Sequence, residues 1–200
     1  GWLCEVGSLR LLFDPILGAS HAGGLFSIEP RRRLSAESLR ADFIFVSHVH
    51  FDHFDVASLG QLAQADDESV VVTSDPLIAE TALALGFRHA KVVPPGARLE
   101  LADGVSVITT PSAAPEVEWG LIVCDASGCV WNLIDTVFGS HEDVERIRKV
   151  ALGERQLDLA IAPLQPMREI AMATAGFIGF EARAYQQLLA CARAAGAKAV

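Results

Sequence analysis

The chain has 200 residues, of which 51% are hydrophobic and 20% are charged, a balance that suits one compact domain with a sizeable core. Its formal net charge of −9 argues against nucleic acid as the main partner, because such binding depends on clustered positive charge. No apolar run approaches the roughly 18 residues of a membrane span, and no basic segment precedes a long apolar one at the N-terminus, so we expect a soluble, cytoplasmic protein with no membrane partner.

Short aliphatic or β-branched runs alternate with helical patterns along the chain. The expected strands cover residues 9–13, 42–47, 69–73, 91–93, 105–109, 120–124, 130–134, 157–162 and 197–200. The expected helices cover residues 56–65, 76–85, 142–152 and 181–195. Residues 125–128 form a turn between two strands, which makes 121–133 a hairpin. Because strands follow one another twice without a helix between them, the pattern favours a mixed α/β sandwich over a doubly wound sheet.

The densest group of candidate metal ligands follows the second predicted strand. FVSHVHFDHF places His48, His50, Asp52 and His53 in a His-x-His-x-Asp-His spacing. Residues two apart in an extended backbone point the same way, so His48 and His50 can grip one cation. Asp52 and His53, past the bend, would face a second cation, with the carboxylate supplying an oxygen ligand beside imidazole. The pattern predicts a dinuclear metal centre.

Acidic residues at other strand ends are weaker candidates. Asp135 closes the run 130–134, where a carboxylate can bridge two metals or cap a turn before Thr136. Asp14, before Pro15, is expected in a turn rather than as a ligand.

The remaining histidines, arginines and cysteines show no ligand spacing. His21, His89 and His141 are expected in loops or at the surface, although His21 could line a pocket mouth. The basic cluster at residues 31–33 is expected to be a solvated loop, with an anchor for an anionic substrate group as the alternative. The cysteines lack CxxC spacing and are predicted to be reduced, packed thiols: Cys4, Cys124, Cys129 and Cys191.

Three segments follow one another in the order of three motifs of the metallo-β-lactamase fold superfamily: FVSHVHFDHF, the strand 105–111 and NLIDT. The chain resembles this superfamily over nearly its whole length. Within the superfamily, the chain is most similar to the compact branch that includes ascorbate-phosphate lactonase and related small hydrolases. This similarity is carried by two segments, LLFDP and LDLAIAPL. The resemblance implies an α/β fold, a four-layer αββα sandwich, in which Asp135 supplies the bridging aspartate.

Two departures from the superfamily's pattern concern metal ligands. The third motif usually places a histidine where this chain has Ala113, so one ligand of the first metal is missing. The last histidine is expected after a strand that stops here at Val200. The chain also begins in what resembles the second half of a hairpin, so we expect residues 1–200 to be a single domain truncated at both ends, with the strand 197–200 pointing at the metals.

A dinuclear site would favour hydrolysis. Two cations a few Å apart lower the pKa of a bridging water and hold it as hydroxide, and they polarise the substrate oxygen. We expect two divalent metal ions, zinc first and iron second, held by His48, His50, Asp52, His53 and Asp135, with Asp52 also orienting the hydroxide as the catalytic residue. The small-molecule substrate would be an ester, lactone, amide, thioester or phosphodiester.

Two other functions compete with hydrolysis. In the oxygenase branch of this fold, which holds two irons, a glutamate replaces the third histidine, and Glu116 or Glu118 could do so here, with Glu116 favoured. The loss of a histidine at Ala113 could instead mark a metal-poor pseudoenzyme that acts as a binding module. The oligomeric state stays open.

Overall fold

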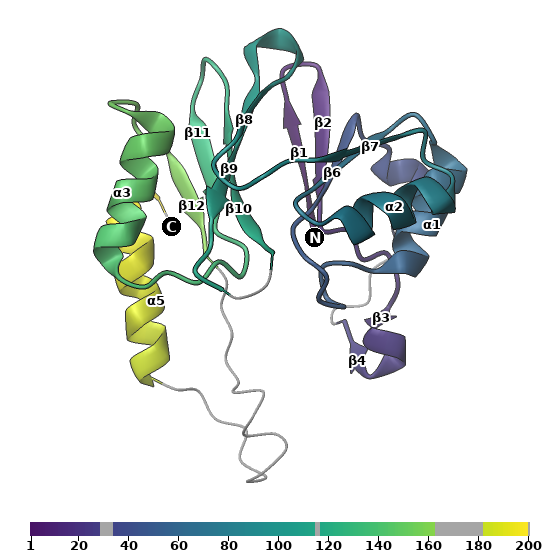
Figure 1. The fold of residues 1–200 in the computed structure, drawn as a ribbon, viewed down its shortest axis with the longest axis horizontal. Helices are drawn as coiled ribbons and strands as arrows, with labels where there is room; N and C mark the ends of the chain where they lie inside the picture. The colour runs from purple at the N-terminus through teal and green to yellow at the C-terminus, as the bar shows by residue number, and fades with distance from the viewer. Residues whose placement is uncertain (29–33, 115–116, 163–181, 200) are drawn as a thin grey trace, which may run out of the picture.

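The computed structural model describes residues 1–28, 34–114, 117–162 and 182–199, apart from some side chains between 182 and 188. Within these residues two five-stranded sheets lie face to face, and helices cover the outer face of each (Figure 1). The expected four-layer αββα sandwich is confirmed.

The first sheet has the order β1-β2-β5-β6-β7. Its strands are β1 (Trp2–Val6), β2 (Leu9–Phe13), β5 (Phe43–Val46), β6 (Val70–Thr73) and β7 (His89–Val92). Only β1 runs antiparallel to its neighbour, and the other four are parallel. The carboxyl ends of β2, β5 and β6 therefore meet at one edge, and Asp14 and Ser47 follow two of these ends. Helices α1 (Val56–Ala65) and α2 (Pro76–Leu85) cover this sheet.

The second sheet has the order β12-β11-β10-β9-β8. Its strands are β8 (Arg98–Glu100), β9 (Ser106–Pro111), β10 (Trp119–Cys124), β11 (Cys129–Asn132) and β12 (Leu159–Ile161). All pairs are antiparallel except β11 with β12. Helices α3 (His141–Leu152) and α5 (Ala182–Ala194) cover its outer face (Figure 1). Short elements complete the chain: β3 (Ser20–His21), η1 (Ala22–Gly24), β4 (Phe26–Ser27), η2 (Ala36–Leu39) and η3 (Ala102–Gly104).

The strands divide their side chains between apolar layers, as the period of two requires. On β5, Phe45 packs between the two sheets, whereas Ile44 packs under α1 and α2. On β10, Leu121 packs between the sheets, and Ile122 packs in the outer layer that also contains residues of α3. Both sheets are thus buried on two faces, which fixes the positions of the strand ends.

Apart from the last strand, the predicted elements agree with the observed ones to within two residues, and the bounds of α1 and α2 are confirmed. Polar caps explain the sharp helix starts, because Asp55 accepts the backbone N–H of Ser58 and Asp75 accepts that of Leu77. The expected last strand is reduced to a bridge in which Ala199 pairs in parallel with Leu159. Val200 lies outside the described residues, so its predicted approach to the site stays a prediction.

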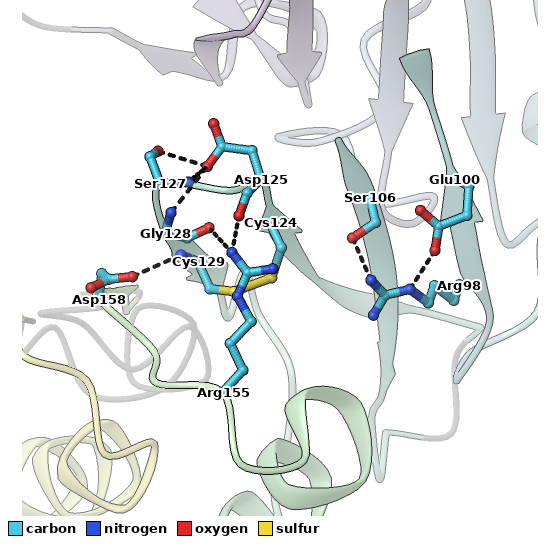
Figure 2. Close-up of a disulfide and its surroundings, with 10 residues drawn as sticks. All are labelled: Arg98, Glu100, Ser106, Cys124, Asp125, Ser127, Gly128, Cys129, Arg155 and Asp158. Atoms are coloured by element: carbon cyan, nitrogen blue, oxygen red, sulfur yellow. Dashed lines mark hydrogen bonds and ion pairs between the residues drawn. A yellow bond between two sulfur atoms is a disulfide. The ribbon is translucent and has the colours of Figure 1, made fainter. Parts of the chain in front are cut away.

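The prediction of reduced thiols is wrong for Cys124 and Cys129, which form a disulfide (Figure 2). The two residues stand directly opposite each other on β10 and β11 with their Cα atoms 4.3 Å apart. Their side chains therefore project from the same face of the hairpin, within bonding reach. The predicted turn at residues 125–128 left the two cysteines on either side of it, but neither that turn nor the cysteine spacing suggested a disulfide. Cys4 and Cys191 are free, as predicted.

Candidate metal centre

The site lies where the carboxyl ends of β2 and β5 meet the loop that follows β11. Asp14 follows β2 with a left-handed backbone (φ 42°) and is 6% exposed. One of its carboxylate oxygens accepts the backbone N–H of Ser47 at 2.7 Å, and the other accepts the Ser47 hydroxyl at 3.0 Å. Strain at a buried non-glycine residue is typical of functional sites. Asp14 is therefore more than a turn residue, and it fastens the start of the histidine motif to β2.

The Asp14–Ser47 pair also fixes the orientation of His48. The Oγ atom of Ser47 lies 2.9 Å from Nδ1 of His48. Because that hydroxyl gives its proton to Asp14, Nδ1 of His48 is the donor, and Nε2 keeps its lone pair. Burial, followed by the charge of His53, lowers the pKa of His48 to about 4. His48 is thus a neutral imidazole at neutral pH, which is the state that a metal ligand requires.

His50 faces the free nitrogen of His48. The Nδ1 atom of His50 lies 2.9 Å from Nε2 of His48, and the ring centroids are 4.4 Å apart at 75°. The two nitrogens converge as predicted, although β5 ends at Val46 and the chain already bends at residues 49 and 50.

His53 lies between carboxylates. Its Nδ1 is 2.9 Å from Asp14, and its Nε2 is 3.2 Å from Oδ2 of Asp135 and 3.6 Å from Oδ2 of Asp52. Burial alone would lower the pKa of His53, but the hydrogen bonds and charges of Asp135 and Asp14 outweigh it and raise the pKa to about 10. Burial would raise the pKa of Asp135, but the hydrogen bond and charge of His53 hold it below its usual value. In the metal-free protein, protonated His53 thus donates hydrogen bonds to the carboxylates of Asp14 and Asp135.

Asp135 reaches the site through an unusual backbone turn. Ile134, directly before it, has a φ of 52°, which is rare for a β-branched residue. Thr136, directly after it, bonds back to the carbonyl of Leu133 through both its N–H and its hydroxyl. These features turn Asp135 toward the histidine motif on the facing sheet.

The five predicted side chains lie together in two overlapping groups. His48, His50 and Asp135 form one group, and Asp52, His53 and Asp135 form the other. Within each group, one ligand atom from each residue lies within 4.8 Å of the others. Asp135 is common to both groups.

The two candidate glutamates differ in what the structure shows. Glu118 is 6% exposed, and its carboxylate accepts the hydroxyl of Ser112. It belongs to neither ligand group. Glu116 lies outside the described residues. Ala113 is held by a hydrogen bond from its N–H to the carbonyl of Val137 at 2.9 Å, so this loop is tied to the loop of Asp135.

The other polar candidates lie outside the two ligand groups among the residues that the structure describes. His21 stacks on Phe26, His89 lies 3.9 Å from Glu68, and His141 lies 3.4 Å from Glu142. The arginine cluster 31–33 is not among the described residues.

A cavity of about 180 Å³ opens beside the second group. Asp14, Asp52, His53 and Asp135 supply its charged lining, and the apolar lining comes from both sheets: Trp2, Ile134, Ile161 and Ala162. The cavity is large enough for part of a small substrate to lie next to the candidate ligands.

Comparison with known proteins agrees with this fold. No family model matches the chain. A metal-dependent hydrolase of Pyrobaculum neutrophilum is 28% identical over 187 residues, which cover 86% of this chain and 74% of the relative. The crystal structure of a possible metal-dependent hydrolase from Veillonella parvula superposes with a TM-score of 0.67 at 17% identity, covering 98% of this chain and 79% of that one. The chain has the metallo-β-lactamase fold that its sequence motifs indicate.

Another structure of similar fold is that of CmlA, a diiron β-hydroxylase from Streptomyces venezuelae. It superposes with a TM-score of 0.65 at 18% identity, and the match covers 92% of this chain but 37% of the hydroxylase. Such a match shows the fold alone. Within the part of the chain that the structure describes, no helix is long and apolar enough to cross a membrane.

Proposed function

We propose that the protein is a metal-dependent hydrolase that holds two divalent cations. The observation that carries the proposal is the pair of ligand groups that share Asp135. His48, His50 and Asp135 would hold one cation, and Asp52, His53 and Asp135 would hold the other. The sharing supports a dinuclear centre over two independent sites.

The donor set fits such cations. His48 presents a neutral Nε2, and Asp14 orients His53 through Nδ1 so that Nε2 faces Asp52 and Asp135. A carboxylate on the far nitrogen of a metal-binding histidine is a common supporting contact. Imidazoles with carboxylates suit zinc, our first choice, and iron is the second.

The chemistry of the site is hydrolysis of a small molecule. When bound, the two cations would lower the pKa of a water and polarise the oxygen of the bond to be broken. Asp52 lines the cavity with a side chain that is 51% exposed, so we assign it the orientation of the attacking water. Asp52 can also take the proton of this water and deliver it to the leaving group. The substrate would be an ester, lactone, amide, thioester or phosphodiester.

A second candidate function is oxygenation at a diiron site. It is favoured by Ala113 in place of the third histidine, together with the buried Glu118 carboxylate a few residues further along. If Glu118 or Glu116 completed the first group, the site would be richer in carboxylates, which suits iron. A metal-poor binding module is the third possibility.

Metal analysis of the purified protein separates these functions. Two zinc ions per chain, together with hydrolysis that chelation abolishes, would support the hydrolase. Two irons with a charge-transfer band would support the oxygenase, and less than one metal per chain would support the binding module. Asp135→Asn should lose more than one metal equivalent, because both groups contain Asp135. Asp158→Asn is the matched control, since Asp158 bonds the backbone of Cys129 instead.

A further inference from the structure

Asn132 ends β11 and faces the space between the two sheets. It stands directly opposite Leu121 of β10, and the side chains of opposite residues lie on the same face of a sheet. Because Leu121 packs between the sheets, the side chain of Asn132 points there too. Asn132 is 7% exposed, and it lines the cavity together with three of the candidate ligands: Asp52, His53 and Asp135.

A backbone contact fixes the orientation of the Asn132 amide. Its Oδ1 accepts the backbone N–H of Ile134 at 3.2 Å, and only the oxygen of a carboxamide can accept, so Nδ2 is the other atom. Among the residues that the structure describes, none accepts a hydrogen bond from Nδ2. The described polar atoms that are fully buried without a partner do not include Nδ2, so this atom is open to the cavity that Asn132 lines.

An unused donor in a small cavity suits an oxygen acceptor. The cavity of about 180 Å³ is smaller than most small-molecule sites, which measure about 300–1,000 Å³, so a group that enters it lies close to the side chains of the lining. A nearly buried amide gains free energy when its N–H groups find an acceptor. Every substrate class of the proposed hydrolase contains a carbonyl or phosphoryl oxygen. An amide donates to neutral and to anionic oxygens alike, so the charge of the substrate does not decide the fit.

We propose that Asn132 is a substrate-binding residue whose Nδ2 donates a hydrogen bond to the carbonyl or phosphoryl oxygen of the substrate. This role rests on the proposed hydrolase function and adds a contact at the same site. The competing role is purely structural: Asn132 would serve only the turn before Asp135, through the contact of Oδ1 with Ile134. The two roles use different atoms of one side chain, so substitutions can separate them.

Two variants keep an acceptor for the N–H of Ile134 and remove the donor at Nδ2. Asn132→Asp has the same shape but adds a charge, and Asn132→Ser is neutral but ends one bond short of Nδ2. Both should hydrolyse para-nitrophenyl acetate or bis(para-nitrophenyl) phosphate with kcat/KM lowered about threefold to tenfold, at wild-type zinc content. Gln64→Glu, which adds a charge on α1 outside the described cavity lining, should match the wild type. Unchanged kcat/KM in both variants, or a loss in Asn132→Asp alone, would overturn the donor role.

Magnetic resonance observes the donor directly. Asn132 is the only asparagine among the 200 residues, so labelling with ¹⁵N-asparagine gives one side-chain amide signal and one backbone signal. The zinc-loaded protein is titrated with N-methylacetamide, which supplies a carbonyl oxygen, and with dimethyl phosphate, which supplies phosphoryl oxygens. We expect a saturable shift of the side-chain signal with at least one probe, and the probe that causes it identifies the kind of oxygen. No shift with either probe would overturn the proposal, even if the variants lose activity.

The two measurements separate failure of this role from failure of the hydrolase proposal. A saturable shift of the Asn132 side-chain signal, without hydrolysis of either ester, would support Asn132 as a donor to a bound oxygen while the hydrolase proposal fails. Hydrolysis that both variants leave unchanged, with no shift of the side-chain signal, would leave the hydrolase standing and overturn the role of Asn132.

Discussion

Asp14 accepts a hydrogen bond from Nδ1 of His53 at 2.9 Å, and the same carboxylate accepts the Ser47 hydroxyl that contacts Nδ1 of His48. One carboxylate therefore orients two candidate ligands, so that both histidines present Nε2 to the centre. This relationship joins the ends of β2 and β5, which are neighbouring parallel strands.

Asp14→Asn should weaken zinc binding by about 10-fold to 100-fold, because the loss of a supporting contact behind a ligand has effects of this size. Isothermal titration with zinc measures the change. Asp42→Asn is the matched control, since Asp42 accepts the backbone N–H of Arg10 in the same sheet but does not contact the site. Equal losses in the two variants would show that Asp14 acts only on the fold.

The stability of the metal-free protein should depend on pH through His53 and His48. The pKa of His53 is raised from 6.5 to about 10 on folding, so its stabilising contribution is present below pH 6.5 and is lost as the pH rises to about 10. The pKa of His48 is lowered from 6.5 to about 4 on folding, so the unfolded state binds a proton more readily than the folded state does. His48 therefore reduces the stability of the fold as the pH falls from 6.5 to about 4. Together these two groups favour a maximum near pH 6.5.

Urea unfolding in the presence of a chelator, from pH 4 to pH 10, checks this expectation. His53→Gln should remove the decline on the alkaline side. Saturating zinc should also reduce that decline, because the cation takes the place of the proton at Nε2. A flat alkaline limb in the chelated wild-type protein would contradict the raised pKa of His53.

The sequence predicted the elements and the grouping of candidate ligands because both rest on short-range patterns. The close spacing of His48 and His50 after a strand predicted that their rings would lie together, and a continuous apolar run located β5. On its own, Asp135 was a weak candidate for a metal ligand, because the left-handed backbone of Ile134 and the position of Asp135 beside His53 depend on the tertiary structure. The family resemblance supplied its assignment.

Other features were missed because they depend on which strands are neighbours. Asp14 looked like a turn residue, and only the pairing of β2 with β5 puts its carboxylate beside Ser47 and His53. The strands β3, β4 and β8 have two or three residues each, too few for a period to be visible. The ligand expected beyond Val200 remains a prediction.

Gly120→Ala should destabilise the fold by about 1–3 kcal/mol and reduce metal content, because it adds an atom to a closely packed place. A Cβ at this position would lie 2.5 Å from Oγ1 of Thr110 and 2.9 Å from Oγ1 of Thr136, the residue after Asp135. Thermal unfolding and metal analysis measure both effects. Gly60→Ala on α1 is the control, since its Cβ would meet only Leu85 at 3.6 Å and a helical alanine is favourable. Equal behaviour of the two variants would contradict the packing argument.

Reduction of the Cys124–Cys129 disulfide should lower the free energy of unfolding without changing metal content. The cysteines are five residues apart, and the chain-entropy model gives about 2 kcal/mol for so short a loop. The turn keeps other support, because Arg155 donates to the carbonyls of Asp125 and Gly128 and Asp158 accepts the N–H of Cys129 (Figure 2).

The disulfide also lies at the end of the β10–β11 hairpin away from Asp135, since Leu121 pairs with Asn132 at the other end. Thermal unfolding with and without a phosphine reductant, with thiols counted by alkylation and mass spectrometry, measures the effect. Cys4→Ser should show the same response to reduction, because Cys4 is free. Loss of zinc on reduction would mean that the hairpin transmits the state of the disulfide to the metal centre, contrary to this expectation.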